Sequence, residues 1–181
     1  MEQHSNQLDR STFFQQLEGF VSMNRLHTGS IAVCLATAQA LAQTPSVQTV
    51  SAEQVATLEQ SLHAQADATN GTATGDLARY PGYYTQLVYR DRNGVVEIHN
   101  QFDEIMIVME GKATVITGGA AQNVKATKPG ELRGTSILGG TPAEMEKGNL
   151  VHIPANTPHQ VFVPSGGSVT YIDVKIAHAQ S

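Results

Sequence analysis

The sequence predicts an all-β protein, an antiparallel sandwich or barrel preceded by one helix, and two observations support this prediction. From Tyr80 onward, short aromatic and β-branched runs recur about every 8–12 residues with turn residues between them, which is typical of small sandwiches and barrels. Before that region, only one segment with helical periodicity precedes the strands. The 181-residue chain is 40% hydrophobic and contains 16 glycines. A chain of this size can bury a core without disulfides.

The helix is expected over residues 51–65. Ser51 followed by Gln54 has the form of a capping box, in which each residue bonds a backbone N–H of the other. Apolar residues then recur at a spacing of three to four, which places them on one helical face: Val55, Leu58 and Leu62. Residues 67–76 are small and polar, so they are expected to form a loop, and residues 43–80 are assigned to helix and linker.

The barrel is assigned to residues 81–177 and is expected to consist of short strands. The expected strands are residues 83–89, 95–99, 105–109, 113–117, 150–153, 160–163 and 169–176. Asn93-Gly94 is a tight-hairpin signal between the first two strands, and Glu110-Gly111 joins the third to the fourth.

Strand 105–109 is apolar at every position, whereas a strand with one solvent-exposed face should alternate between apolar and polar residues. Both faces are therefore expected to be covered, one by the barrel interior and the other by a second sheet or a partner subunit. The second alternative favours a homodimer.

Residues 23–42 have the pattern of a secretory signal peptide. A short cationic start is followed by an apolar run and by the small residues of a cleavage site at Ala40 and Ala42. The run is too short to span a bilayer, so no membrane association is expected for the mature form, which we expect to be periplasmic or secreted. Residues 1–22 are interpreted as a non-native extension before a true start at Met23, the alternative being an amphipathic N-terminal helix.

The net charge and the distribution of basic residues argue against nucleic acids as partners. The formal net charge is −5, and the lysines and arginines are scattered singly along the chain. Because no basic stripe could follow a phosphate backbone, nucleic-acid binding is not expected, and the expected partner is a small molecule.

Two segments carry residues suited to metal binding. The first runs from Glu97 through His99 to Glu104 and is followed by Gly111, seven residues after the carboxylate. The second begins at Gly148 and ends in His159, with a proline six residues after Gly148. These segments resemble the two sequence motifs of the cupin superfamily.

The resemblance covers residues 82–176 and implies a single cupin-type antiparallel β-barrel, jelly-roll-like, with His99, Glu104 and His159 as metal ligands. The sequence departs from the motifs in four ways. Glu97 replaces the first histidine, Asn156 a glycine and Val163 an asparagine, and the glycine that opens the first motif is out of register, since Gly94 lies too close to Glu97. The first departure leaves Glu97 as a fourth ligand, a general base or a solvent-facing residue.

The physical chemistry of these residues agrees with the resemblance. Glu97 and His99 are two apart on an expected strand, so their side chains lie on the same face. A set of imidazoles and carboxylates suits a divalent Fe, Mn, Ni or Zn ion. Tyr89, Gln101 and Arg133 are candidates for the wall of a substrate pocket, with Arg133 facing an anionic group.

The sequence therefore predicts a metal-binding protein and leaves two functions open. One is a metal-dependent enzyme acting on a small molecule, of the dioxygenase, isomerase or lyase type. The other is a non-catalytic exported protein that binds a small molecule. A shared fold does not decide between them, because function depends on the site.

Overall fold

The computed structural model describes residues 47–178, which form one helix and twelve strands. The helix is α1 (Ala52–Asp67). The strands are β1 (Thr72–Tyr80), β2 (Tyr83–Arg90), β3 (Val96–His99), β4 (Phe102–Thr117), β5 (Ala120–Gln122), β6 (Lys125–Lys128), β7 (Glu131–Gly134), β8 (Ser136–Leu138), β9 (Thr141–Glu146), β10 (Leu150–Ile153), β11 (His159–Phe162) and β12 (Val169–Ala177). No helix in this part of the chain is long and apolar enough to cross a membrane.

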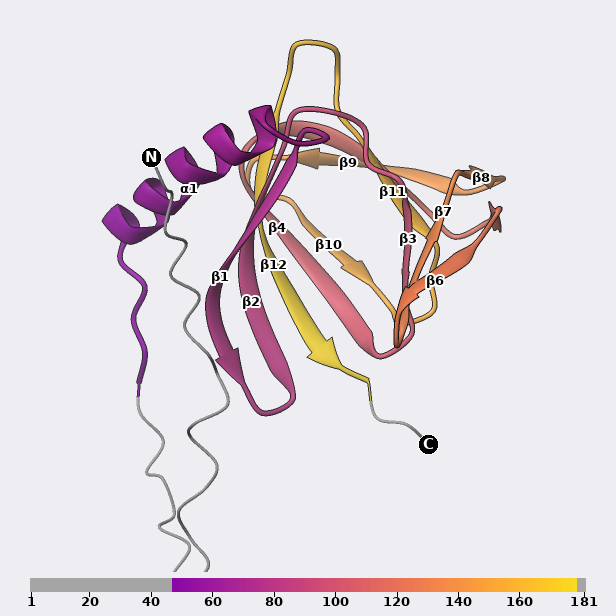
Figure 1. Cartoon of the computed structure of the whole chain (residues 1–181), viewed down its shortest axis with the longest axis horizontal. Coiled ribbons are helices and arrows are strands. Elements are labelled where there is room, and N and C mark those ends of the chain that lie inside the picture. The colour runs from indigo at the N-terminus through magenta and orange to yellow at the C-terminus, as the bar shows by residue number, and fades with distance from the viewer. Residues whose placement is uncertain (1–46, 179–181) are drawn as a thin grey trace, which may run out of the picture. The chain divides into compact units, whose positions relative to one another are not determined.

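Ten of the strands form one antiparallel sheet that curls around an enclosed interior (Figure 1). Its main path runs β1-β2-β12-β4-β11-β3-β7-β6, and β9 and β10 also pair with β4. Strands β5 and β8 pair separately. The predicted fold class, an antiparallel β-barrel with one N-terminal helix, is confirmed for the described residues.

Strand β4 holds the curl together because it belongs to two parts of the sheet. Its first half pairs with β12 and β10, and its second half pairs with β11 and β9. The two strands expected at 105–109 and 113–117 are thus one strand that bends between them. The register with β12 shifts between Val108 and Glu110. Gly111 follows directly, with φ of 72°, and an added Cβ there would collide with the carbonyl of Ser168. Only glycine accommodates both constraints at low cost.

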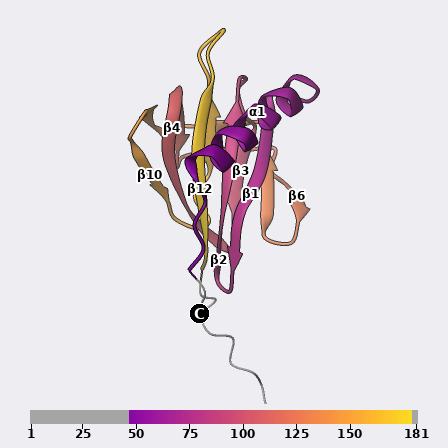
Figure 2. The same cartoon turned by 90° about the vertical axis from the view of Figure 1, so that its left-hand side faces the viewer.

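Helix α1 confirms the expected capping box. The Ser51 side chain accepts a hydrogen bond from the Gln54 backbone N–H, and the Gln54 side chain accepts one from the Ser51 N–H. The helix lies across the outer face of β1 and β2, as Figure 2 shows. Its buried residues Leu62 and Ala66 form a small apolar cluster there with Leu87.

The loop expected over residues 67–76 is wrong from Thr72 onward. Residues Thr72–Tyr80 form β1, which pairs with β2 along its length, so the sheet begins before residue 81. The segment is rich in small residues, so it lacks the bulky apolar runs from which a strand is predicted. Small side chains suit this position because α1 lies directly over it: Ala73 is buried, and Gly75 faces the side chain of Leu58.

The hairpin expected at Asn93-Gly94 is also wrong. Strand β2 pairs with β1 and β12, whereas β3 pairs with β7 and β11. These two residues instead bind the segment between β2 and β3 to β11 and to the residue that follows β11. The Gly94 N–H donates to the Val161 carbonyl (2.8 Å), and the Asn93 side chain accepts from the Val163 N–H (2.9 Å).

One face of residues 105–109 is covered within the sheet itself. Met106 and Val108 are buried and belong to the apolar core. On the opposite face Ile105 and Ile107 are half-buried, and Met109 is 39% exposed. A partner subunit on that face stays a prediction. The predicted extension 1–22 and signal peptide 23–42 lie outside the described residues.

Candidate metal centre

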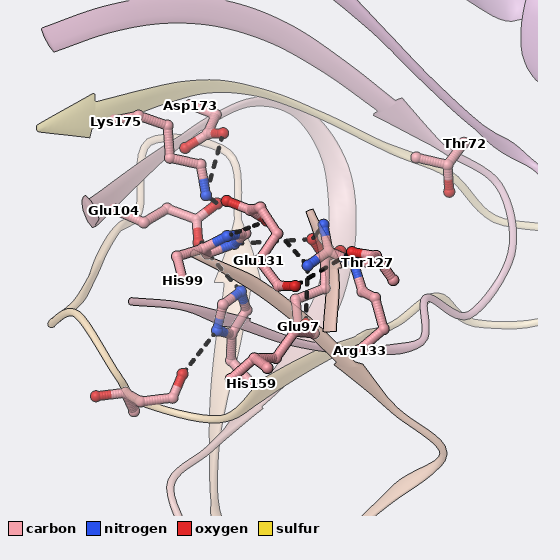
Figure 3. A network of polar contacts seen from close by, with 12 residues as sticks. Thr72, Glu97, His99, Glu104, Thr127, Glu131, Arg133, His159, Asp173 and Lys175 are labelled. Atoms are coloured by element: carbon pink, nitrogen blue, oxygen red, sulfur yellow. Dashed lines mark hydrogen bonds and ion pairs between the residues drawn. The ribbon is translucent and has the colours of Figure 1, made fainter. Parts of the chain in front are cut away.

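Three side chains from three strands meet inside the curled sheet (Figure 3). His99 ends β3, Glu104 lies near the start of β4 and His159 begins β11. All three are buried, with 5%, 4% and 2% of their surface exposed. The Glu104 Oε2 atom lies 3.1 Å from His159 Nε2 and 3.5 Å from His99 Nε2. The structure therefore brings together the three residues that the cupin resemblance identified.

The backbone around His159 explains one departure from the motif. Asn156 adopts φ of 66°, in the left-handed region that glycine favours and that asparagine tolerates better than most residues. Its N–H donates to the His99 carbonyl (2.9 Å), so this turn ties the two histidine segments together. Asn156 thus fills the glycine position without loss of the turn.

Both imidazole rings are oriented through their Nδ1 atoms. His99 Nδ1 is 2.8 Å from Glu131 Oε2, and His159 Nδ1 is 3.0 Å from the Thr157 carbonyl. Because each partner is an acceptor, Nδ1 carries the proton in the neutral ring and Nε2 keeps a free lone pair. Both free lone pairs face Glu104.

Glu131 contacts the candidate site and was not predicted from the sequence. It lies on β7, opposite His99 in the register of β3 and β7. Neither motif includes it, and no local signal marks β7 as a neighbour of β3. A carboxylate bound to the far nitrogen of a metal-binding histidine is a recurrent feature of metal sites, because it fixes the ring and raises its basicity.

The donor atoms fit a divalent metal. Nε2 of His99, Oε2 of Glu104 and Nε2 of His159 are buried and have no hydrogen-bond partner among the described residues. Leaving such atoms unsatisfied is costly, so three of them converging on one point indicates a missing common partner. Donors bound at about 2.1 Å lie about 3.0–3.4 Å apart in octahedral or tetrahedral shells. The Glu104–His159 distance of 3.1 Å falls in this range, and the Glu104–His99 distance of 3.5 Å is slightly longer.

Glu97 offers an alternative third donor, but it is otherwise engaged. One oxygen from it and a nitrogen from each histidine lie within 4.8 Å of one another. However, its Oε1 accepts from Arg90 (2.6 Å), and its Oε2 is 3.4 Å from Arg133 and 3.8 Å from His99 Nε2. Glu104 approaches both histidines more closely, so it is the better third ligand and Glu97 lies at the edge of the site.

Burial and four charged or titratable neighbours, Arg90, His159, Glu104 and Arg133, act on the charge of Glu97. Burial raises the pKa of Glu97, but the Arg90 guanidinium, together with His159 and Arg133, outweighs this, so the pKa is lowered. With its side chain 18% exposed, Glu97 is not a solvent-facing strand residue. A lowered pKa makes it a weaker base, so its role as a general base stays a prediction.

Strand β12 supplies a second layer of charge behind Glu104. Lys175 Nζ lies 2.8 Å from Glu104 Oε1 and 3.8 Å from Asp173 Oδ2. Burial raises the pKa of Glu104, but the imidazole of His159 and the Lys175 ammonium hold that pKa well below its usual range. Burial, with the charge of Glu104, raises the pKa of Asp173 to about 8, so this carboxyl is mainly neutral at pH 7. Lys175 therefore holds one oxygen of Glu104 and leaves the other for a metal.

The site opens into a cavity of about 420 Å³. Its wall is polar and charged, with Val88 as the one aliphatic residue among the described lining. Arg133 lies on this wall, as predicted.

Tyr89 and Gln101 do not line the cavity, so the prediction for them is wrong. On β2 the cavity is lined by alternate residues: Tyr84, Gln86, Val88 and Arg90. Tyr89 therefore lies on the outer face under α1, with its ring 4.0 Å from that of His63. Gln101 is exposed, in the turn between β3 and β4, where its carbonyl accepts from the His178 N–H. Tyr89 points away from the cavity because successive side chains of a strand lie on opposite faces.

Comparisons with known proteins give structural likeness alone. No family model matches the chain, and no curated protein matches it. The chain is similar to a structure of KdgF from Halomonas sp. (18% identity, 62% of this chain and 86% of that one, TM-score 0.46). It is also similar to a recombinant oxalate oxidase in complex with glycolate (17%, 64% and 56%, 0.46). A third similar structure is a cupin-2 domain containing protein from Shewanella frigidimarina (17%, 57% and 79%, 0.41).

Proposed function

We propose that this chain, which has the cupin-type β-barrel fold, binds a divalent metal and acts as a metal-dependent enzyme on a small polar molecule. One observation carries the proposal. Three buried donor atoms, from His99, Glu104 and His159, have no hydrogen-bond partner among the described residues and converge beside a cavity of about 420 Å³. Two imidazoles with one carboxylate suit Fe(II), Mn(II), Ni(II) or Zn(II) and leave coordination positions open.

The chain's own residues would divide the work at such a site. Glu131 and the Thr157 carbonyl hold the imidazoles with Nε2 toward Glu104, and Lys175 fixes the opposite oxygen of that carboxylate. When bound, the metal supplies Lewis acidity toward a substrate oxygen. Glu97, at the edge of the site, is the candidate general base. These roles are compatible with dioxygenase, isomerase or lyase chemistry.

The alternative is a non-catalytic exported protein that binds a small molecule. It is favoured by Glu97, because two guanidinium groups engage this carboxylate where the motif has a histidine. The state of the metal shell distinguishes the two functions. In the Co(II)-substituted protein, an enzyme site should show a d–d spectrum that shifts with added azide, whereas a spectrum that azide does not change would contradict catalysis.

Metal content tests the centre itself. The full chain, purified and offered each of the four metals, should retain close to one ion per chain by elemental mass spectrometry. His159→Ala and Glu104→Ala should each abolish retention. His152→Ala is the matched control, because His152 is exposed on neighbouring β10 and does not line the cavity. Wild-type protein that retains no metal would refute the proposal.

We also propose that the protein is exported and forms a homodimer. The signal-peptide pattern at residues 23–42 supports export to the periplasm or the medium. The half-exposed apolar side chains of Ile105 and Ile107 support a subunit contact on that face of β4. N-terminal sequencing of the secreted form and sedimentation equilibrium test the two proposals separately.

A further inference from the structure

We infer that the cavity binds a small carboxylate ligand, whose carboxylate is held by the Nε and Nη2 atoms of Arg133 while its other polar end reaches the metal centre. The inference rests on the proposed metal function and specifies its substrate class. Three features carry it: the edge of one guanidinium that no hydrogen bond engages, the charge balance of the cavity wall, and the short distance between Arg133 and the histidines.

The Arg133 guanidinium is held by hydrogen bonds at one end, while at its other end the Glu97 carboxylate is the one paired group among the described residues, with Oε2 3.4 Å from Nη2. Its Nη1 donates to Glu131 Oε2 (3.0 Å) and to the Leu132 carbonyl (2.9 Å). Within residues 47–178, no hydrogen bond engages its Nε or Nη2, and the side chain is 32% exposed on the cavity wall. Nε and Nη2 present two parallel N–H groups, the arrangement that binds a carboxylate with two hydrogen bonds.

The other arginine on the wall lacks such an edge. Arg90 uses Nε on the Tyr171 hydroxyl, Nη1 on Thr72 and Nη2 on Glu97, and only 8% of it is exposed. Each of its nitrogens thus has a partner within the fold. Of the two guanidinium groups on the wall, Arg133 is the one that keeps a nitrogen, Nε, without a hydrogen-bond partner among residues 47–178.

The charge on the cavity wall favours an anion once a metal is bound. The lining contains four cationic side chains: Arg90, Lys128, Arg133 and Lys175. It contains four carboxyl groups: Glu97, Glu104, Glu131 and Asp173. These charges balance even if every carboxyl is ionised, so a divalent ion would leave two positive charges in excess. Uncompensated charge in a partly buried cavity is costly, and an anionic ligand offsets it.

The two ends of the ligand site are close together. Glu97 Oε2 lies 3.4 Å from Arg133 Nη2 and 3.8 Å from His99 Nε2, so one oxygen atom already lies near both groups (Figure 3). A small hydroxy acid can therefore reach from Arg133 to the metal centre. Lys128, exposed on the wall at β6, adds positive charge to the cavity lining.

Isothermal titration of the Zn(II)-loaded full chain with glycerate and with glycerol tests the inference, because the two probes differ in one carboxylate. Glycerate should bind at least about tenfold more tightly than glycerol. Arg133→Gln should weaken glycerate binding by about tenfold or more and leave glycerol binding unchanged. Arg133→Lys, which keeps the charge but loses the paired donors, should fall between them. Zinc content is measured after each titration, because hydroxy acids can extract metal.

Arg79→Gln is the matched control, since Arg79 is an exposed arginine paired with Asp76 outside the cavity. It should bind glycerate like the wild type. Equal binding of glycerate and glycerol, or unchanged glycerate binding by a zinc-loaded Arg133 variant, would overturn the inference while the metal centre stands. If Arg133→Gln loses zinc, Arg133→Lys decides by the same criterion. Wild-type protein that holds no zinc would instead overturn the metal function, and this inference with it.

Discussion

The interior of the curled sheet has a polar half and an apolar half, and the same strands build both. On β4 the inward side chains change from Glu104 to Met106 and Val108. On β11 they change from His159 to Val161, and β12 changes similarly: Lys175 and Asp173 are followed by Tyr171 and Val169. Each strand therefore passes from the candidate site into the core within a few residues.

The side chains of the two halves tolerate burial for different reasons. The apolar half needs no partners, since removal of its side chains from water is favourable. The polar half depends on pairing: Arg90 with Glu97, Lys175 with Glu104, and Glu131 with His99. The donor atoms that face one another at the candidate site, and Asp173 Oδ1, have no hydrogen-bond partner among the described residues. Buried ion pairs seldom add net stability, so the apolar half stabilises the fold while the polar half is retained for its chemistry. The following changes test this division.

The largest effect is expected from Arg90→Met, which leaves Glu97 buried without its nearest cation. Because an unpaired buried charge is strongly unfavourable, the free energy of unfolding should fall by about 3–5 kcal/mol. Urea denaturation of chelator-treated protein measures it. The double variant Arg90→Met/Glu97→Gln should recover most of the loss, and a single variant as stable as the wild type would show that this pairing is dispensable.

Met106→Ala should cost a comparable or smaller amount, about 2–5 kcal/mol, because Met106 is 1% exposed in the apolar core and truncation leaves a cavity. The same denaturation experiment applies. Metal content should stay at the wild-type level below the unfolding transition. Loss of metal from the folded variant would mean that the two halves are not independent.

Glu131→Gln should weaken metal binding by about 10- to 100-fold, because the amide orients His99 less firmly and does not raise its basicity. Competition with a chromophoric chelator measures the affinity. Glu144→Gln serves as control, since Glu144 is an exposed residue on β9 that does not line the cavity. An unchanged metal affinity would show that Glu131 does not support the metal site and only pairs with Arg133.

The smallest change in stability is expected from replacing a whole pair. Glu104→Leu/Lys175→Met removes both buried charges, so the metal-free protein should be as stable as the wild type or more stable, while metal retention is lost. Denaturation and elemental analysis of the same preparation measure both properties. A marked loss of stability would show that this ion pair contributes to the fold.

Local sequence patterns allowed much of this structure to be predicted. The capping box at Ser51 was readable because it depends on neighbours three residues apart. The strands β2, β10 and β12 were readable because bulky and β-branched runs mark them. Strand β1 was missed because its small residues signal a strand only once the helix above them is known.

The sequence by itself determined the barrel, its helix, and the meeting of His99, Glu104 and His159, because two motifs with defined spacing carried those donors. Only the tertiary structure decided which charges surround them. Glu131 contacts His99 across 32 residues, and Arg90 contacts Tyr171 across 81. Such pairings depend on strand order and register, which are set by packing between distant segments and leave no trace in local periodicity.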